Sequence, residues 1–274
     1  MTGACLPLRL GVMNPTRCFA LAATTLTFFT IAASQSLARE YYELRTYRLK
    51  SEAKAAAFDK TFGPAIVEAM EAAAVGPIGI FKPTESKDTD KGEVLRYVLA
   101  PYKSIEEWAG ISDRLKENGA IWEPALEFLM ASKADTNYSR IDSMLLVAFD
   151  GMPKLKLPAK PKDADARHFE IRTYESHSIV KGALKVEMFN EGELDIFKKT
   201  GLDAVFFGEA KIAKDLPQLT YMLVYDSEEA RKKAWAAFLA HPDWLKLKEN
   251  GRYKDTVSKI HSSFVKATEY SQIK

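Results

Sequence analysis

The feature that most constrains the fold of this chain is a short motif that occurs twice. Residues 43–47 read ELRTY and residues 170–174 read EIRTY. Two further pairs of segments match in the same order: LRYVLAPYKSIEEW from Leu95 with LTYMLVYDSEEARKKAW from Leu219, and SRIDSMLL from Ser139 with SKIHSSFV from Ser258. The three offsets are 127, 124 and 119 residues. Because the order is kept while the spacing drifts, the sequence predicts two tandem copies of one module.

Both copies have the same predicted order of strands and helices. Strands are expected at 41–48, 78–81, 94–100 and 141–149, and again at 167–174, 204–208, 219–225 and 257–267. A long helix follows the first strand of each copy, and a second helix follows the third strand. The evidence for these helices is an apolar stripe, a pair of N-cap serines and two pairs of tryptophans: Phe58, Phe62, Ile66 and Met70; Ser104 and Ser227; Trp108 with Trp235, and Trp122 with Trp244.

This order predicts an α+β fold made of ferredoxin-like βαββαβ modules. Such a module has a four-stranded antiparallel sheet with both helices on one face, which leaves the other face bare. Two modules in one chain can cover both bare faces by packing their sheets against each other. The expected division is a signal peptide at 1–38, a first module at 39–150, a linker at 151–166 and a second module at 167–274.

The repeated strand alternates between two kinds of side chain. Tyr42, Leu44 and Thr46 share one face of the strand, and Glu43, Arg45 and Tyr47 share the other. In the second copy the corresponding sets are Phe169, Ile171 and Thr173 against Glu170, Arg172 and Tyr174. We expect the apolar sets to lie under the helices and the Glu-Arg-Tyr sets to face a cavity between the two sheets.

The first 38 residues have the features of an export signal. Arg17 gives a basic start, residues 19–33 are apolar, and Ser36 to Ala38 are small residues suited to cleavage before Arg39. The chain is therefore expected to be exported to the periplasm or secreted, with no stable membrane span after processing; an uncleaved anchor is the alternative. Both cysteines, Cys5 and Cys18, lie in this segment, so the mature chain has no disulfide or cysteine site.

Charge and motifs exclude several classes of function. Without Arg9 and Arg17 the chain has 37 basic and 37 acidic residues, and the charges are interspersed, which argues against nucleic-acid binding. The sequence contains no P-loop, nucleophile elbow, zincin motif or dinucleotide fingerprint. It therefore indicates no cofactor and leaves the catalytic residues unknown.

The chain resembles the NIPSNAP family of the dimeric α/β-barrel superfamily. The resemblance depends on YELRTYRLK from Tyr42, on FEIRTYE from Phe169, on the two strand-to-helix junctions, and on AHPDW from Ala240. It extends over both modules, although the first has IWEP from Ile121 where the second has HPDW. It implies a barrel of paired sheets with an interior cavity, in a family of poorly defined activity. Related families include monooxygenases, haem-binding enzymes and proteins without known chemistry.

The four histidines could each serve as a ligand, but none defines a site. His168 and Glu170 lie two residues apart on one face of a strand, and two ligands are too few for a metal centre. The alternative for His168 is a hydrogen bond to the backbone at the strand end. His241 precedes Pro242 and is expected at a helix N-terminus. No metal site is predicted.

The Glu-Arg-Tyr rows are the best candidates for a ligand-binding site. The residues concerned are Glu43, Arg45, Tyr47 and Tyr97, and Glu170, Arg172, Tyr174 and Tyr221. The arginines could hold an anionic or carbonyl group, or the rows could fix strand register instead. The leading hypothesis is an exported protein that binds a small molecule. The alternatives are a cofactor-independent monooxygenase or haem-handling enzyme, and a structural or assembly module that forms a homodimer.

Overall fold

The computed structural model describes residues 38–84, 92–117, 119–161 and 163–274. The predicted signal peptide lies outside the described residues. The first half contains β1 (Tyr41–Leu49), α1 (Glu52–Ala57), the π-helical turn η1 (Phe58–Phe62), α2 (Gly63–Ala72), β2 (Gly79–Pro83), β3 (Val94–Tyr102), α3 (Ile105–Lys116), η2 (Gly119–Ala125), α4 (Leu126–Leu129) and β4 (Tyr138–Ala148).

The second half repeats this order of elements, except that the short α-helix before its last strand precedes the 3-10 turn instead of following it. It contains β5 (His168–Glu175), α5 (Ile179–Met188), the π-helical turn η3 (Phe189–Glu193), α6 (Leu194–Thr200), β6 (Asp203–Ile212), β7 (Gln218–Tyr225), α7 (Glu228–Ala240), α8 (Pro242–Lys248), η4 (Gly251–Tyr253) and β8 (Lys259–Ala267). All eight strands expected from the sequence are present, and within the described part of the chain no helix is long and apolar enough to cross a membrane.

Serine N-caps start the helices at matching places in the two halves. Ser51 and Ser178 accept a hydrogen bond from the backbone N–H three residues on, and begin the helix after the first strand. Ser104 and Ser227 do the same for α3 and α7, as the sequence predicts. The two later serines lie 123 residues apart, which fixes how the second helices of the two halves correspond.

The eight strands form one closed antiparallel barrel in the order β1-β3-β2-β8-β5-β7-β6-β4. Four strands come from each half, and the halves join at two seams. At one seam Phe81 of β2 pairs with Ala267 of β8, and at the other Leu146 of β4 pairs with Ala210 of β6. The sheets of the two halves therefore meet within a single chain.

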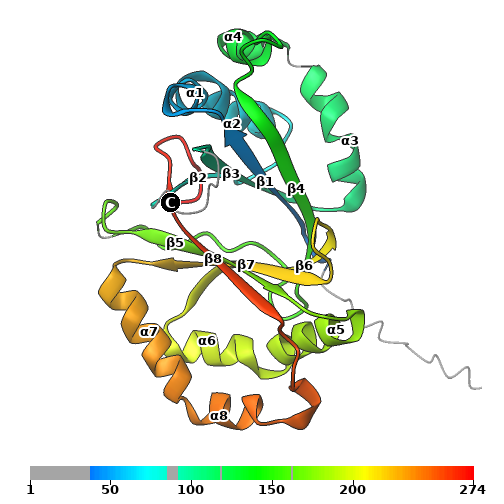
Figure 1. Cartoon of the computed structure of the whole chain (residues 1–274), viewed down its shortest axis with the longest axis vertical. Helices are drawn as coiled ribbons and strands as arrows, with labels where there is room; N and C mark the ends of the chain where they lie inside the picture. Colours follow the sequence, from blue (N-terminus) through cyan, green and yellow to red (C-terminus); the bar gives the residue numbers. More distant parts are fainter. Residues whose placement is uncertain (1–37, 85–91, 118, 162) are drawn as a thin grey trace, which may run out of the picture. The chain divides into compact units, whose positions relative to one another are not determined.

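Helices cover the outside of each sheet, as Figure 1 shows for α5 and α6 below β7 and β8. Three apolar clusters fill the spaces between the sheets and their helices and between the two sheets. One lies between the first sheet and its helices, with Phe58, Phe62, Ile66 and Met70 among its members. A second lies between the second sheet and its helices, and the third joins the inner faces of the two sheets.

The prediction of which strand face lies under the helices is wrong. Tyr42, Leu44, Phe169 and Ile171 belong to the cluster between the two sheets, whereas Tyr47 belongs to a cluster under the helices. The same holds for Tyr174 in the second half. The physical reason is that the two inner faces meet at close range and need apolar side chains to fill the space. A charged row there would be buried between two sheets, while under the helices it can reach solvent at the rim.

Candidate functional site

In the first half, Glu43 is the centre of a small polar cluster on the helix side of the sheet. Its side chain accepts hydrogen bonds from Arg45 Nε at 2.7 Å, from Ser143 Oγ at 2.7 Å and from the Tyr102 hydroxyl at 3.3 Å. β1, β4 and β3 supply these groups from adjacent strands. Glu43 is 5% exposed, but the Arg45 side chain is 39% exposed. The carboxylate is thus already occupied by three donors and is poorly placed to act as a free base.

In the second half, Glu170 has the same three kinds of partner. Arg172 Nη1 and Ser262 Oγ each donate to its Oε1 at 2.5 Å, and the Tyr225 hydroxyl donates to its Oε2 at 3.0 Å. Arg172 also donates its Nε to the Tyr221 hydroxyl at 2.9 Å and its Nη2 to Tyr174 at 3.3 Å. All three guanidinium nitrogens of Arg172 therefore bind protein groups.

Seven of the eight predicted site residues come together in these two clusters, including Tyr47, which lies on the same strand face as Arg45. Tyr97 does not, because it lies in the cluster between the two sheets. Tyr221 does reach Arg172, but its counterpart in the first half is Val98, the residue that pairs with Arg45. The pairing of Tyr97 with Tyr221 was thus one residue out of register, and such a slip moves a side chain to the other sheet face.

Sequence reasoning missed four residues that bind the two glutamates. Tyr102 and Tyr225 are equivalent, since each precedes its N-cap serine by two residues. Ser143 and Ser262 are equivalent as well. The signal for the serines was present, because SRIDS and SKIHS, from Ser139 and Ser258, share both their serines. The N-cap serines, at an offset of 123, would have aligned the tyrosines correctly.

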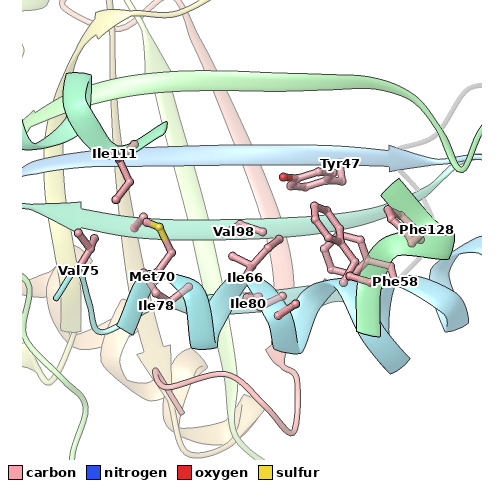
Figure 2. Packing of buried hydrophobic residues seen from close by; sticks show 14 of the residues in the cluster. Tyr47, Phe58, Ile66, Met70, Val75, Ile78, Ile80, Val98, Ile111 and Phe128 are labelled. Atoms are coloured by element: carbon pink, nitrogen blue, oxygen red, sulfur yellow. The ribbon is translucent and has the colours of Figure 1, made fainter. Parts of the chain in front are cut away.

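A cavity of about 100 Å³ lies beside the first-half cluster, between the sheet and its helices. Its polar lining comes from Glu43, Arg45, Tyr47, Tyr102 and Ser112, and its apolar lining comes from Phe62, Ile66, Met70, Val98, Ala100, Ile111, Leu115 and Trp122. Figure 2 shows Ile66 and Met70 of α2 beside Val98 of β3 in this layer. The cavity combines one basic side chain with apolar walls, but it is not between the two sheets, where it was predicted.

Larger side chains occupy the corresponding place in the second half. On the neighbouring strand, Val98 lies opposite Arg45, whereas Tyr221 lies opposite Arg172. In the same way, Ala100 lies opposite Glu43, whereas Leu223 lies opposite Glu170.

The helices α3 and α7 show the same difference between a small and a large side chain. Ser112 and Trp235 each lie eight residues after their N-cap serine. The Trp235 ring centroid is 4.8 Å from Arg172 Cζ, and its indole N–H donates to Tyr225 at 2.8 Å. Three small residues therefore leave space in the first half, and three large ones fill it in the second.

The local electrostatics keep the arginines charged and the tyrosines protonated. Burial alone would lower the pKa of Arg45, but the hydrogen bond and charge of Glu43 outweigh burial and raise that pKa above its ordinary value. Burial raises the pKa of the Tyr102 phenol well above its ordinary range, and the charge of Glu43 adds to the shift. Burial and Glu170 have the same effects on Tyr225. These tyrosines are hydrogen-bond donors at neutral pH.

A buried ion pair adjoins the second-half cluster. Lys185 Nζ lies 2.7 Å from Glu193 Oε2, and the two residues are 4% and 2% exposed. Lys185 also lies over the Phe189 ring, 4.6 Å from its centroid. Burial raises the pKa of Glu193, while the charge of Lys185 opposes that rise. Phe62, the last residue of the first-half π-helical turn, holds the place of Glu193.

Three of the four histidines contact other groups of the protein. His168 Nδ1 lies 3.3 Å from the Ala166 carbonyl, which is the alternative to metal binding considered from the sequence. His241 caps α8, as predicted. His261 Nε2 contacts Glu175 Oε1 on the neighbouring strand. The described residues include no group of three or more metal-ligating side chains.

Comparison with known proteins identifies the family of one half and the fold of the whole. Residues 169–272 match the NIPSNAP family model, whereas no curated protein matches the chain. A candidate monooxygenase from Lactobacillus acidophilus NCFM has a TM-score of 0.53 and 9% identity, covering 84% of this chain and 94% of its own. A candidate monooxygenase from Fusobacterium nucleatum has a TM-score of 0.51 and 10% identity, covering 85% and 94%.

A NIPSNAP family protein with unknown function from Agrobacterium tumefaciens strain C58 has a TM-score of 0.37 and 16% identity, covering 42% of this chain and 100% of its own. Similarity at such low identity describes the fold and leaves the reaction open. Residues 169–272 therefore match the NIPSNAP family model, in a chain whose α+β fold is similar to that of the two candidate monooxygenase structures.

Proposed function

We propose that this protein binds a compact small molecule in the first-half cavity, with Arg45 as its main polar contact. The observation that carries the proposal is the cavity itself, where a partly exposed guanidinium adjoins walls that are largely apolar. Small-molecule sites commonly combine apolar walls with a few placed polar groups. The alternative role, in which the rows only fix strand register, does not account for the open space beside Arg45.

The size of the cavity limits the ligand. Its volume is about 100 Å³, whereas an engineered apolar cavity that binds benzene measures about 150 Å³. A bound molecule with one small ring or a short branched chain therefore matches the site, and a haem or flavin does not fit without movement of the helices.

We further propose that the two halves are tandem copies of one module and that one copy has kept the open site. Matching residues around Glu43 and Glu170 support the duplication. The replacement of small residues by Tyr221, Leu223 and Trp235 supports a single site for each chain.

Native mass spectrometry of the protein from its own compartment tests this proposal. We expect one small molecule per chain, retained under gentle ionisation and lost on denaturation. Arg45→Gln should weaken retention by about tenfold or more, because it removes a charge-assisted hydrogen bond. The matched variant Arg172→Gln should keep the ligand. Two ligands per chain, or a ligand lost only in Arg172→Gln, would contradict the assignment.

A cofactor-independent monooxygenase is the second candidate function. It is favoured by the fold shared with two candidate monooxygenases over most of this chain. A haem-handling enzyme of the same fold would show a Soret band on purification or on haem titration. Oxygen uptake with an aromatic substrate, in protein without a visible chromophore, would support the monooxygenase over simple binding.

We also propose that the chain is exported and cleaved before Arg39. Amino-terminal sequencing of protein from the exported fraction should begin at Arg39. A chain that retains residues 1–38 and sediments with membranes would instead support the uncleaved anchor. Sedimentation of the cleaved protein also tests for the homodimer expected from the sequence.

A further inference from the structure

The charge balance of the first-half cavity points to the kind of polar group that its ligand carries, and this inference rests on the proposed function. Among the described residues that line the cavity, Arg45 is the one basic side chain. Its Nε is 2.7 Å from Glu43 Oε1, and Glu43 is 5% exposed. The two opposite charges therefore neutralise each other before any ligand enters.

A carboxylate ligand would upset this balance. Its negative charge would share the Arg45 guanidinium with Glu43, so that two anions would face one cation beside apolar walls. A buried ion is tolerated when a counter-ion of its own compensates the loss of water. The hydroxyls of Tyr102 and Ser143 do not supply that charge, because they are neutral donors, and they already donate to Glu43.

A carbonyl oxygen meets the same donor without this cost. It accepts hydrogen bonds from a guanidinium and brings no net charge, so little hydration is lost when it is buried. We propose that the ligand of this cavity is a neutral, compact carbonyl compound, such as a small ketone, aldehyde or amide. Its oxygen accepts from Arg45, and its apolar body lies against Phe62, Met70 and Val98.

The second half offers a check on this reasoning. Arg172 also has a glutamate partner, and there the additional acceptors of its guanidinium are the neutral hydroxyls of Tyr174 and Tyr221. The protein itself thus completes the Glu-Arg pair with neutral oxygen acceptors. In the first half the proposed carbonyl oxygen accepts a hydrogen bond from Arg45, as the Tyr221 hydroxyl accepts one from Arg172 in the second half.

Calorimetric titration with three probes that each have fewer non-hydrogen atoms than benzene tests the proposal: butanone, propanoate and cyclopentane. At neutral pH we expect butanone to bind wild-type protein about tenfold or more tightly than either of the others. Equal or tighter binding of propanoate would overturn the carbonyl assignment while keeping the cavity as a binding site. Binding of none of the three would instead overturn the proposed function itself.

Glu43→Gln should remove the preference between butanone and propanoate. The amide keeps an oxygen acceptor for Arg45 but removes the competing negative charge, so propanoate affinity should rise by about tenfold or more and butanone affinity should change by less than about threefold. Glu170→Gln, the matched control, should change neither affinity by more than about twofold, because Glu170 lies outside the cavity. Unchanged propanoate binding in folded Glu43→Gln protein would overturn the proposal. If that variant does not fold, the titrations of wild-type protein with the three probes decide whether the proposal holds.

Discussion

Replacing Val98, Ala100 and Ser112 by their second-half counterparts should abolish ligand binding. The triple variant Val98→Tyr, Ala100→Leu and Ser112→Trp places large side chains in the cavity beside Arg45, where the second half already accommodates the same residues. We expect affinity for butanone to fall by about a hundredfold or more, because the ligand loses its space as well as its contacts. Calorimetry measures the loss, and circular dichroism checks that the variant folds.

The reverse exchange is the matched control. Tyr221→Val, Leu223→Ala and Trp235→Ser should open space beside Arg172 and give the chain a second site, at a cost in stability because two buried side chains and one partly buried side chain are truncated. Retained binding in the filled first-half variant, with its fold intact, would show that the ligand lies elsewhere.

Breaking the buried pair of Lys185 and Glu193 should cause the largest loss of stability. Lys185→Met leaves the Glu193 carboxylate buried without its counter-ion, which costs about 3–5 kcal/mol of the free energy of unfolding. Urea denaturation monitored by tryptophan fluorescence gives this number, since Trp235 and Trp244 lie in the same half.

The double variant Lys185→Met with Glu193→Leu distinguishes the loss of one charge from the loss of the whole ion pair. With both charges replaced by apolar side chains, we expect stability within about 1 kcal/mol of wild type, because the desolvation of two ions is no longer needed. The first half supports this expectation, since it has Phe62 where the second has Glu193. A double variant as unstable as Lys185→Met would mean that the pair is held by contacts other than charge.

The sequence predicted the strands and the helices because these follow from local signals. Motif repetition, an apolar helix stripe and serine N-caps each depend on a few neighbouring residues. The faces of the repeated strand could not be assigned in the same way. One face has Glu43 and Arg45 together with Tyr47 and Leu49, so both faces of β1 are partly apolar. Alternation divides a strand into two faces without telling which partner each face meets.

The candidate site was predicted in part. Glu43 and Arg45 were predicted to share one strand face, as were Glu170 and Arg172, and each of these two pairs forms a salt bridge. The cavity was misplaced because its position depends on tertiary packing: small residues from β3 and α3 leave the space, and they are not adjacent in sequence. The register error at Tyr97 has a simpler cause. Matching the strands by their letters gave an offset of 124, whereas the N-cap serines give 123.

Crystallography under xenon pressure tests the central claim most directly, because xenon enters dry apolar cavities without needing a known ligand. The account predicts xenon density in the first half, between the sheet and its helices, next to Ile66, Met70 and Val98. It predicts none beside Arg172, where Tyr221 and Trp235 fill the space. Xenon density beside Arg172 or between the two sheets, with none near Val98, would contradict it.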